Sequence, residues 1–551
     1  MAHFVQQFGR KLDKPFFKKA GWVFLPLVIL LFIGNDARLI KAAYEADGPP
    51  AGLILLFYIP AFFSCFALLQ SKKAWVRVLF RILLFSAIYT DGLYLLIGNF
   101  PFSYPDAINL FNNPAYASSS LTTFKAAFLL AFAGAAVFFA LVMLSVRRFS
   151  FSFTGGWLLL FIALQALAFG YAKKHPGAHD FLPALYRVTG NLLAADRIRA
   201  EDKWRREEVA ASPVQPGIKH VFLVVDESVE GSCLSVNGFA LNTTPFLQKQ
   251  AKQFINFGLA SSFTNASAGS NLSLLSGMRM CELPDQQYLS FRKPTLFQYA
   301  RKAGYQTFLL DGQANGHTLQ NYNTRKDLHF VDSLYQPGAA KEFAALYMRD
   351  SMLAEKIVQL ACSTRPTFAY VNKQGAHWPY KNNFPPGLRM DHFNELENKK
   401  GANAAPYFSS VFWNVDRFWQ SVATKLAGQS GVLILYTSDH GENYAAGALN
   451  ITHASIYNAG KIEGQVPLLA YDHAGFFPAG FSPDQNGYSH ESLFPTLLSA
   501  MGYDSCFVRQ QYGKTLLEKP SQEPRWFLTG DLFGRGKNSS IFIDPLPFSC
   551  P

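Results

Sequence analysis

Two strand-like segments of the sequence end in residues that can bind a metal. Val432–Leu435 is an aliphatic run that leads to Asp439-His440, and Val221–Val225 is a second run that leads to Asp226-Glu227. Continuous apolar strands are typical of parallel sheets, in which polar ligands gather beyond the carboxyl ends of the strands. Carboxylates and an imidazole together suit zinc or manganese. We therefore predict one metal site built from both segments.

A hydroxyl-rich segment could supply a nucleophile to this site. Residues 261–277 contain several serines and threonines and indicate the start of a helix. A hydroxyl at a helix amino terminus beside a divalent cation can ionise near neutral pH, because the cation and the helix dipole stabilise the alkoxide and an incoming phosphate. Most of these hydroxyls are expected only to cap and pack, so the pattern alone leaves the nucleophile open.

From His220 onward, strand patterns alternate with helix patterns. The strands are predicted at His220–Val225, Gln306–Leu310, Thr367–Val371, Val432–Tyr436 and Val466–Ala470. The helices are predicted at Thr295–Ala303, Phe343–Ala361, Phe408–Ala427 and Glu491–Met501. This alternation predicts a soluble α/β domain over residues 217–551, with a mostly parallel sheet covered by helices on both faces.

The first part of the chain is predicted to cross a membrane. Its five apolar segments are near the roughly 20 residues that a spanning helix needs: Ala20–Gly34, Ala51–Gln70, Val76–Ile97, Leu121–Val146 and Gly155–Ala172. We predict a five-helix transmembrane domain over residues 1–172 and a helical connector over residues 173–216. Lys and Arg concentrate before the first segment and in alternate loops, which predicts a cytoplasmic amino terminus and an extracytoplasmic carboxyl-terminal domain.

The net charge of +12 comes partly from these cytoplasmic flanks. A second basic group follows the fifth apolar segment: Arg187, Arg197, Arg199, Lys203, Arg205 and Arg206. A solvated or membrane-skirting helix is the simpler interpretation, and affinity for anionic lipid is the functional one. Nucleic acid is not an expected partner of an extracytoplasmic domain. Asp91, within the third apolar segment, could reach water or have a direct functional role.

An ordered set of short segments resembles a known superfamily. The segments lie between about residues 220 and 500: Val224–Ser228, Leu234–Phe239, Asn242–Leu247, the hydroxyl-rich segment, Gly375–His377, Ser438–Glu442, Thr452-His453 and Ser489–Phe494. They make the outer domain similar to the alkaline-phosphatase/sulfatase superfamily. The whole chain, five spans included, resembles bacterial phosphoethanolamine transferases that modify envelope glycolipids.

The resemblance implies roles for individual residues. Glu227, Asp439 and His440 would be zinc ligands, and Ser267 would be the nucleophile and touch the metal. His377 and His453 would hold phosphoryl oxygens or protonate the leaving group. One zinc ion is expected, these histidines could recruit a second, and manganese is less favoured. Ser stands where the family usually has Thr, so Thr264 and Ser270 remain alternative nucleophiles, and Asn372 stands where a histidine is common.

The implied activity is zinc-dependent transfer of phosphoethanolamine from phosphatidylethanolamine to an envelope glycolipid or glycan, such as lipopolysaccharide lipid A or core. It would proceed through a covalent phospho-Ser intermediate. We expect a monomer in the bacterial inner membrane with a periplasmic catalytic domain. Sulfatase activity is disfavoured, because no candidate serine has Pro at +2 and Arg at +4. The alternatives are a phosphoglycerol transferase of the lipoteichoic-acid-synthase type and a non-catalytic membrane scaffold with a retained fold.

Overall fold

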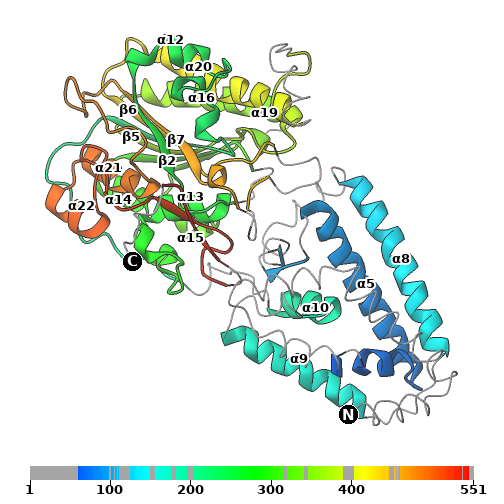
Figure 1. Cartoon of the computed structure of the whole chain (residues 1–551). Helices are drawn as coiled ribbons and strands as arrows, with labels where there is room; N and C mark the ends of the chain where they lie inside the picture. Colours follow the sequence, from blue (N-terminus) through cyan, green and yellow to red (C-terminus); the bar gives the residue numbers. More distant parts are fainter. Residues whose placement is uncertain are drawn as a thin grey trace, which may run out of the picture. The chain divides into compact units, whose positions relative to one another are not determined.

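The computed structural model describes residues 60–61, 63–98, 101–104, 106–107, 110, 124–148, 156–174, 182–194, 204–314, 319–339, 345–388, 403–445, 452–454, 456, 459–535 and 538–544. The chain forms two compact units, Met1–Ile198 and Arg199–Pro551 (Figure 1). The first predicted span, Ala20–Gly34, lies outside the described residues, as does half of the second, Ala51–Gln70.

The described part of the first unit is helical. Its main helices are α5 (Ala74–Gly98), α8 (Lys125–Arg148), α9 (Gly156–Lys174) and α10 (Ala184–Ala194). The first three coincide with the third, fourth and fifth predicted spans. Among the described residues, two helical stretches are long and apolar enough to cross a membrane, Ala74–Ile97 and Lys125–Leu144, while α9 offers the shorter apolar stretch Gly156–Leu167. Five spans therefore remain a prediction.

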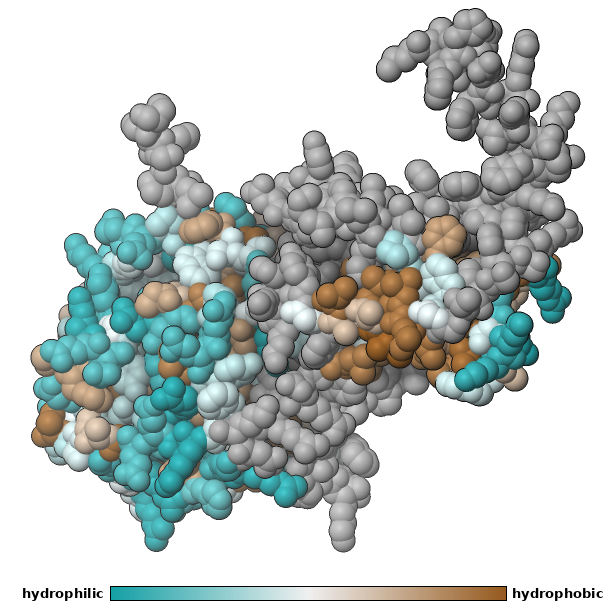
Figure 2. All heavy atoms as spheres, turned by 90° about the horizontal axis from the view of Figure 1, so that it is seen from below, coloured by the Kyte–Doolittle hydropathy of each residue, from teal (hydrophilic) through white to brown (hydrophobic). Residues whose placement is uncertain are grey.

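Large apolar side chains are exposed on these helices. All but three of the exposed large hydrophobic residues in the described chain belong to the first unit, among them Trp75, Ile82, Leu130, Val137 and Leu159. Figure 2 shows apolar side chains gathered over the helices of this unit, whereas the described surface of the larger unit is mostly polar. An apolar surface of this kind is costly in water and favourable in lipid, which agrees with a membrane-embedded unit.

The carboxylate of Asp91 is buried in this unit and paired. Arg187 of α10 donates to Asp91 through Nε at 3.1 Å and through Nη2 at 2.5 Å, and its side chain is 0% exposed. The backbone N–H of Phe102 also donates to Asp91. The expectation that Arg187 lies on a solvated helix is therefore wrong, and the Asp91 carboxylate is explained by an ion pair that ties α10 to α5.

The predicted helical connector, residues 173–216, is helical only in part. It contains the end of α9 and all of α10, but residues 204–216 are extended. This extended segment is held to the larger unit, where Val214 N–H donates to the Gly502 carbonyl at 2.9 Å. Pro213 and Pro216 disfavour a helix here, because proline lacks the N–H that a helix interior requires.

A seven-stranded mixed sheet forms the centre of the larger unit. The strands are β1 (His220–Asp226), β2 (Phe254–Ser261), β3 (Gln306–Asp311), β4 (Ser333–Tyr335), β5 (Thr367–Asn372), β6 (Val432–Ser438) and β7 (Gln465–Asp472), in the order β2-β7-β6-β1-β5-β3-β4. The five from β6 to β4 are parallel, whereas β7 pairs antiparallel with both β6 and β2. The expectation of a mostly parallel sheet is confirmed.

All five predicted strands are present, and β2 and β4 of this sheet were not predicted. β2 is interrupted by a register shift between Asn256 and Gly258, which hides its apolar pattern, and β4 has only three residues. A separate two-stranded sheet joins β8 (Trp526–Leu528) to β9 (Ser540–Phe542), and these two strands were not predicted either.

Helices cover both faces of the main sheet (Figure 1). On one face, Phe222 and Val224 of β1 share a buried core with side chains from α12 (Pro245–Lys249), α16 (Leu346–Ala361), α19 (Ala404–Val411) and α20 (Arg417–Leu426). The other face carries α13 (Ser267–Ser276), α14 (Leu296–Lys302) and α21 (Leu493–Ala500); Phe297 of α14 meets Phe368 of β5 edge to face there. β1 is consequently buried along its whole length.

The Asp91–Arg187 pair yields a stability prediction. Arg187→Met leaves the Asp91 carboxylate buried without a counter-charge, so we expect a loss of about 3–5 kcal/mol. Thermal unfolding of the full-length protein in detergent measures this loss. The double variant Asp91→Asn/Arg187→Met removes both charges and should recover part of the stability; equal melting temperatures for Arg187→Met and the unaltered protein would contradict the prediction.

Candidate metal centre and active site

The register of β1 and β6 brings the two predicted strand ends together. Asp226 lies opposite Ser438 in this parallel pair, so Glu227 and the pair Asp439-His440 leave the sheet side by side. All three side chains are 0% exposed. The backbone N–H of Ser228, in a left-handed turn with φ 60°, donates to Asp439 Oδ1 at 3.1 Å. A turn on one strand therefore positions a carboxylate delivered by the other.

Ser267 reaches this cluster from the amino terminus of α13. Its hydroxyl lies 3.2 Å from each carboxylate oxygen of Glu227 and 3.1 Å from His440 Nε2. Ser267 is only partly buried. A hydroxyl at the first residue of a ten-residue helix lies where the backbone N–H groups and the dipole favour negative charge. The arrangement can stabilise an ionised serine oxygen and the phosphate that it would attack.

The alternative nucleophiles have other partners. Thr264 Oγ1 lies 3.2 Å from Ser270 Oγ and 2.8 Å from the Ala266 carbonyl, and Ser270 Oγ also bonds to the backbone of Thr264. Both residues are 0% exposed. They stabilise the turn that leads into α13. Gly269 lies in the first turn of this helix, where an added side chain would collide with Thr264. Their contacts are those of residues that shape the loop.

The remaining polar atoms of the cluster are oriented for a cation. His440 Nδ1 lies 2.8 Å from the Gly441 carbonyl, an acceptor that requires a proton on Nδ1, so Nε2 is the ring nitrogen that faces Ser267 and Glu227. Asp439 Oδ2 lies 3.6 Å from His440 Nε2. Although it is buried, no donor among the described residues reaches it. A buried carboxylate oxygen without a donor is costly unless a cation or proton satisfies it.

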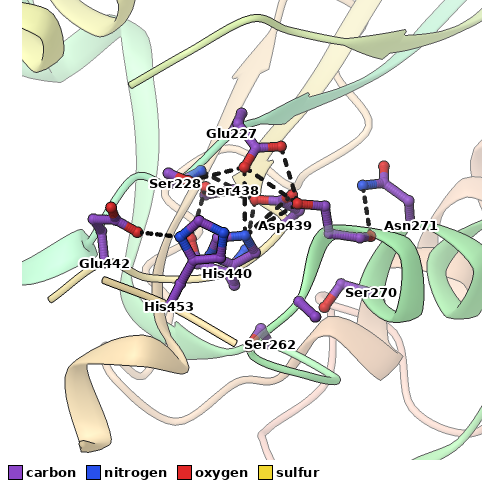
Figure 3. Close-up of polar contacts among 12 residues, drawn as sticks. Glu227, Ser228, Ser262, Ser270, Asn271, Ser438, Asp439, His440, Glu442 and His453 are labelled. Carbon is purple, nitrogen blue, oxygen red and sulfur yellow. Dashed lines mark hydrogen bonds and ion pairs between the residues drawn. The ribbon is translucent and has the colours of Figure 1, made fainter. Parts of the chain in front are cut away.

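His453 completes the group of close ligand atoms. Ligand atoms of Glu227, His440 and His453 lie within 4.8 Å of one another. The His453 ring stacks on that of His440 with 4.4 Å between centroids, and its Nδ1 lies 2.9 Å from Glu442 Oε2 (Figure 3). Such a carboxylate behind a histidine fixes the tautomer and ring orientation. Sequence reasoning assigned Glu442 no role, although it stands two residues after His440.

His377 lies at the open side of the cluster. Its ring centroid is 6.3 Å from that of His453, and its Nδ1 contacts the Trp378 carbonyl. His377 and His453 are partly exposed, unlike the three buried residues. The two histidines therefore border the approach to Ser267.

Asp226 has a different role from its neighbour Glu227. Successive residues on a strand point to opposite faces, and the Asp226 carboxylate turns toward Tyr436 OH, at 2.7 Å, and Lys373 Nζ. Burial raises the pKa of Asp226 to about 6 even though Lys373 opposes the shift. Asp226 thus belongs to a buried structural ion pair.

Two further residues support Glu227. Gln313, which follows β3, donates through Nε2 to Glu227 Oε2 at 2.7 Å and to the Lys373 carbonyl at 2.9 Å. Gly375 packs so closely against the end of β1 that an added Cβ would lie 2.5 Å from the Glu227 carbonyl oxygen, and its φ of 57° also favours glycine. Asn372 bonds to Asp311 and Gln313, which places it in this supporting layer.

The close packing of these charges shifts their pKa values. Burial raises the pKa of Asp439 well above its usual range, and the Glu227 charge adds to this effect. Burial alone would lower the pKa of His440, but the charges of Asp439 and Glu227 raise it to about 10. Burial would likewise raise the pKa of Glu227, but the hydrogen bond and charge of His440 lower it.

The donor set fits a zinc ion. Zinc accepts carboxylate oxygens, imidazole nitrogens and hydroxyls as ligands. Asp439 Oδ2 accepts no hydrogen bond from the described residues, and a cation bound there would satisfy it. Glu227 and His440 belong to the group that could hold the ion. That group includes His453, which was expected to hold phosphoryl oxygens, protonate the leaving group or recruit a second metal, whereas Asp439 touches it through His440.

The family follows from the sequence matched over this domain. The Sulfatase family model matches residues 219–503, more than half of the chain. The protein therefore belongs to the sulfatase family, which confirms the superfamily resemblance inferred from the ordered segments. None of the curated proteins compared with this sequence matches it.

Solved structures extend the likeness beyond this domain. The chain is similar to the integral membrane protein lipooligosaccharide phosphoethanolamine transferase A (EptA) from Neisseria meningitidis, with a TM-score of 0.62 and 17% identity over 91% of this chain and 99% of that one. The C-terminal periplasmic domain of EcEptC from Escherichia coli, in complex with Zn, matches with a TM-score of 0.49 and 18% identity over 62% of this chain and 98% of that one. At this identity the EptA match shows a common fold that includes the membrane part.

The pKa shifts predict how zinc binding depends on pH. Zinc must displace the proton of His440, whose pKa is about 10, so affinity should rise between pH 6 and pH 9 by about tenfold per pH unit for each proton displaced. Calorimetric titration of the metal-stripped full-length protein, in buffers of different ionisation enthalpy, measures both affinity and proton release. A pH-independent affinity would contradict this expectation.

Asp439→Asn should weaken zinc binding by about a hundredfold or more, since even outer-shell changes cost 10–100-fold. Metal analysis after dialysis against a fixed free zinc concentration measures the loss. The exposed residue Asp484 provides a matched control, because Asp484→Asn makes the same chemical change away from the site. Unchanged zinc content in Asp439→Asn would remove this carboxylate from the metal centre.

Proposed function

We propose that this protein transfers phosphoethanolamine from phosphatidylethanolamine to an envelope glycolipid or glycan, such as lipid A or lipopolysaccharide core. One observation carries the proposal: the Ser267 hydroxyl stands at a helix amino terminus within 3.2 Å of both Glu227 and His440, in a sulfatase-family domain. The fold shared with a membrane-bound phosphoethanolamine transferase along 91% of the chain adds support.

In the first half-reaction, Ser267 Oγ attacks the phosphorus of phosphatidylethanolamine. A bond forms between Oγ and phosphorus, and the bond from phosphorus to the diacylglycerol oxygen breaks. The Ser267 hydroxyl lies within hydrogen-bonding distance of Glu227, and its proton would be released to solvent as a cation bound there stabilises the alkoxide. The N–H groups at the start of α13 favour the phosphoryl oxygens. A zinc ion held by Glu227, Asp439 and His440 would polarise a phosphoryl oxygen and favour the ionised serine.

His377 and His453 would serve the leaving group. Both are partly exposed and lie near each other, and His453 stacks on His440, which contacts Ser267. Glu442 bonds to Nδ1 of His453, so its second ring nitrogen would exchange a proton with substrate. The departing diacylglycerol oxygen takes a proton from one of these histidines. The acceptor, a hydroxyl or a singly protonated phosphate, then attacks the phosphorus and gives its proton to that histidine. The bond from phosphorus to Ser267 Oγ breaks, and Oγ leaves as the alkoxide that began the first half-reaction.

The setting follows from the lipid substrates. We propose five membrane spans with the amino terminus in the cytoplasm and the catalytic domain in the periplasm of the inner membrane, where donor and acceptor are both available. The apolar surface of the described helices in the first unit supports this setting. One protein chain contains the complete residue set of the site, which supports action as a monomer.

Replacing the nucleophile provides the sharpest test. Ser267→Ala should lower transfer by about three orders of magnitude or more, because the covalent step loses its oxygen. With phosphatidylethanolamine alone, mass spectrometry of the intact unaltered protein should reveal a covalent adduct of one phosphoethanolamine. Ser267→Ala should lack this adduct and keep the melting temperature of the unaltered protein.

Three controls define the result. Ser267→Thr retains a hydroxyl and should retain measurable transfer. Thr264→Ala and Ser270→Ala should still form the adduct, since their hydroxyls bond to each other and to the loop; an adduct lost in Thr264→Ala but kept in Ser267→Ala would move the nucleophile. An adduct from phosphatidylglycerol in place of phosphatidylethanolamine would establish the phosphoglycerol transferase instead.

A further inference from the structure

A basic cavity lies in the larger unit, and its lining shares no residue with the candidate metal centre. It has a volume of about 520 Å³ and is formed by the extended segment 204–209, α14 and the chain around α15 (Arg325–Leu328). Figure 1 labels both helices. The polar residues that line it are mostly basic: Arg205, Arg206, Arg301, Lys302, Lys326 and His329, with Glu208 as a carboxylate and Gln298 as an amide.

The charges of this cavity are not balanced. Five guanidinium or ammonium groups face one lining carboxylate. Arg206 has a further counter-charge in Asp327, at 2.8 Å from its Nε, so an excess of about three positive charges remains by Coulomb bookkeeping. Like charges gathered in one concave site repel each other, which favours the entry of an anion.

Two of the basic residues have an ordinary structural explanation. Arg301 and Lys302 lie in the last turn of α14, where cations offset the negative end of the helix dipole, and they donate to the carbonyls of His329 and Val209. No such explanation covers Arg205, which comes from a segment without helical structure. The extra positive charge therefore comes from the segment that joins the two units.

This segment is fixed in place by specific contacts. Glu207 N–H donates to the Arg292 carbonyl at 2.7 Å, and Gln298 Nε2 donates to the Glu207 carbonyl at 2.9 Å. Arg206 is tied to Asp327 and to the carbonyls of Ser290 and Lys293. The cavity is consequently a preformed site, which lowers the entropic cost of binding a ligand.

Arg206 also retains unused donor capacity. Its side chain is 7% exposed, and its buried Nη2 has no hydrogen-bond partner among the described residues. A buried guanidinium nitrogen without an acceptor is costly. An anionic oxygen would satisfy it, and guanidinium groups match phosphate oxygens in geometry as well as charge.

We propose that this cavity binds the phosphate group of an envelope lipid, as a monoester or diester headgroup, at a site separate from the reacting serine. The excess charge suits one phosphate. The choice of a lipid as the phosphate source rests on the proposed function, in which donor and acceptor are both lipids. A soluble phosphate shares the same chemistry and is distinguished by the experiment.

Native mass spectrometry of the full-length protein in non-ionic detergent tests the proposal. The probes are dioleoylphosphatidylglycerol, zwitterionic dioleoylphosphatidylcholine and inorganic phosphate. We expect retention of the anionic lipid over the zwitterionic one, and weaker retention at higher salt. Arg205→Gln/Lys326→Gln should reduce the retained anionic lipid by at least about tenfold, because each change removes a charge-assisted contact. Both residues are exposed, so this double variant should keep its melting temperature.

The matched control is Arg417→Gln/Lys425→Gln. It removes one Arg and one Lys from exposed positions on α20, outside the cavity, and should bind as the unaltered protein does. If the first double variant loses its thermal transition, Arg205→Gln alone is used. Equal retention in the cavity and control variants overturns the proposal, and so does binding of inorganic phosphate without lipid.

Repeating the measurement in Ser267→Ala separates this proposal from the proposed function. Retention of the anionic lipid there, lost on adding the cavity changes, supports the cavity whether or not transfer is observed. Absence of lipid binding in a protein that still forms the phosphoethanolamine adduct overturns the cavity proposal alone.

Discussion

Three ionisable side chains, Glu227, Asp439 and His440, share one fully buried position at the carboxyl edge of the sheet. Water cannot solvate their charges there, so they must satisfy one another or hold a cation. The opposing pKa shifts of the three groups express this constraint. Neighbouring groups satisfy further polar atoms of the cluster: the Ser228 N–H, the Gln313 amide and the Gly441 carbonyl each form a hydrogen bond with one of its side chains.

Because side chains alternate along a strand, two adjacent residues at the end of β1 enter different surroundings, one structural and one in the candidate site. Asp226 and Glu227 are adjacent, yet Asp226 enters a buried ion pair with Lys373 and Glu227 enters the metal centre. The first carboxylate anchors the end of β1 against β6 through Tyr436. Its neighbour can then be held within hydrogen-bonding distance of Ser267, because the backbone between them is fixed.

Exposure increases outward from the buried cluster to the groups that would meet substrate. Glu227, Asp439 and His440 are inaccessible, whereas Ser267, His377 and His453 are partly exposed. The histidines are thus the more accessible members of the candidate site. The basic cavity beside segment 204–209 differs in its chemistry, because it is lined by arginine and lysine, whereas the candidate metal centre consists of carboxylates and imidazoles.

Local pattern in the sequence was sufficient for the central strands, the covering helices and the residues at the strand ends. β1 and β6 are continuous apolar runs because both of their faces are buried, and polar residues begin where burial of the strand ends. Long apolar stretches similarly indicated α5 and α8. The resemblance indicated Ser267, but only the tertiary structure brought its hydroxyl, and not those of Thr264 and Ser270, to Glu227 and His440. The tertiary structure also paired Asp91 with Arg187, separated Asp226 from Glu227 and placed Arg205 and Arg206 at a cavity. Each of these outcomes depends on which distant segment packs against the residue, and the spacing of residues along the chain carries no information about that contact.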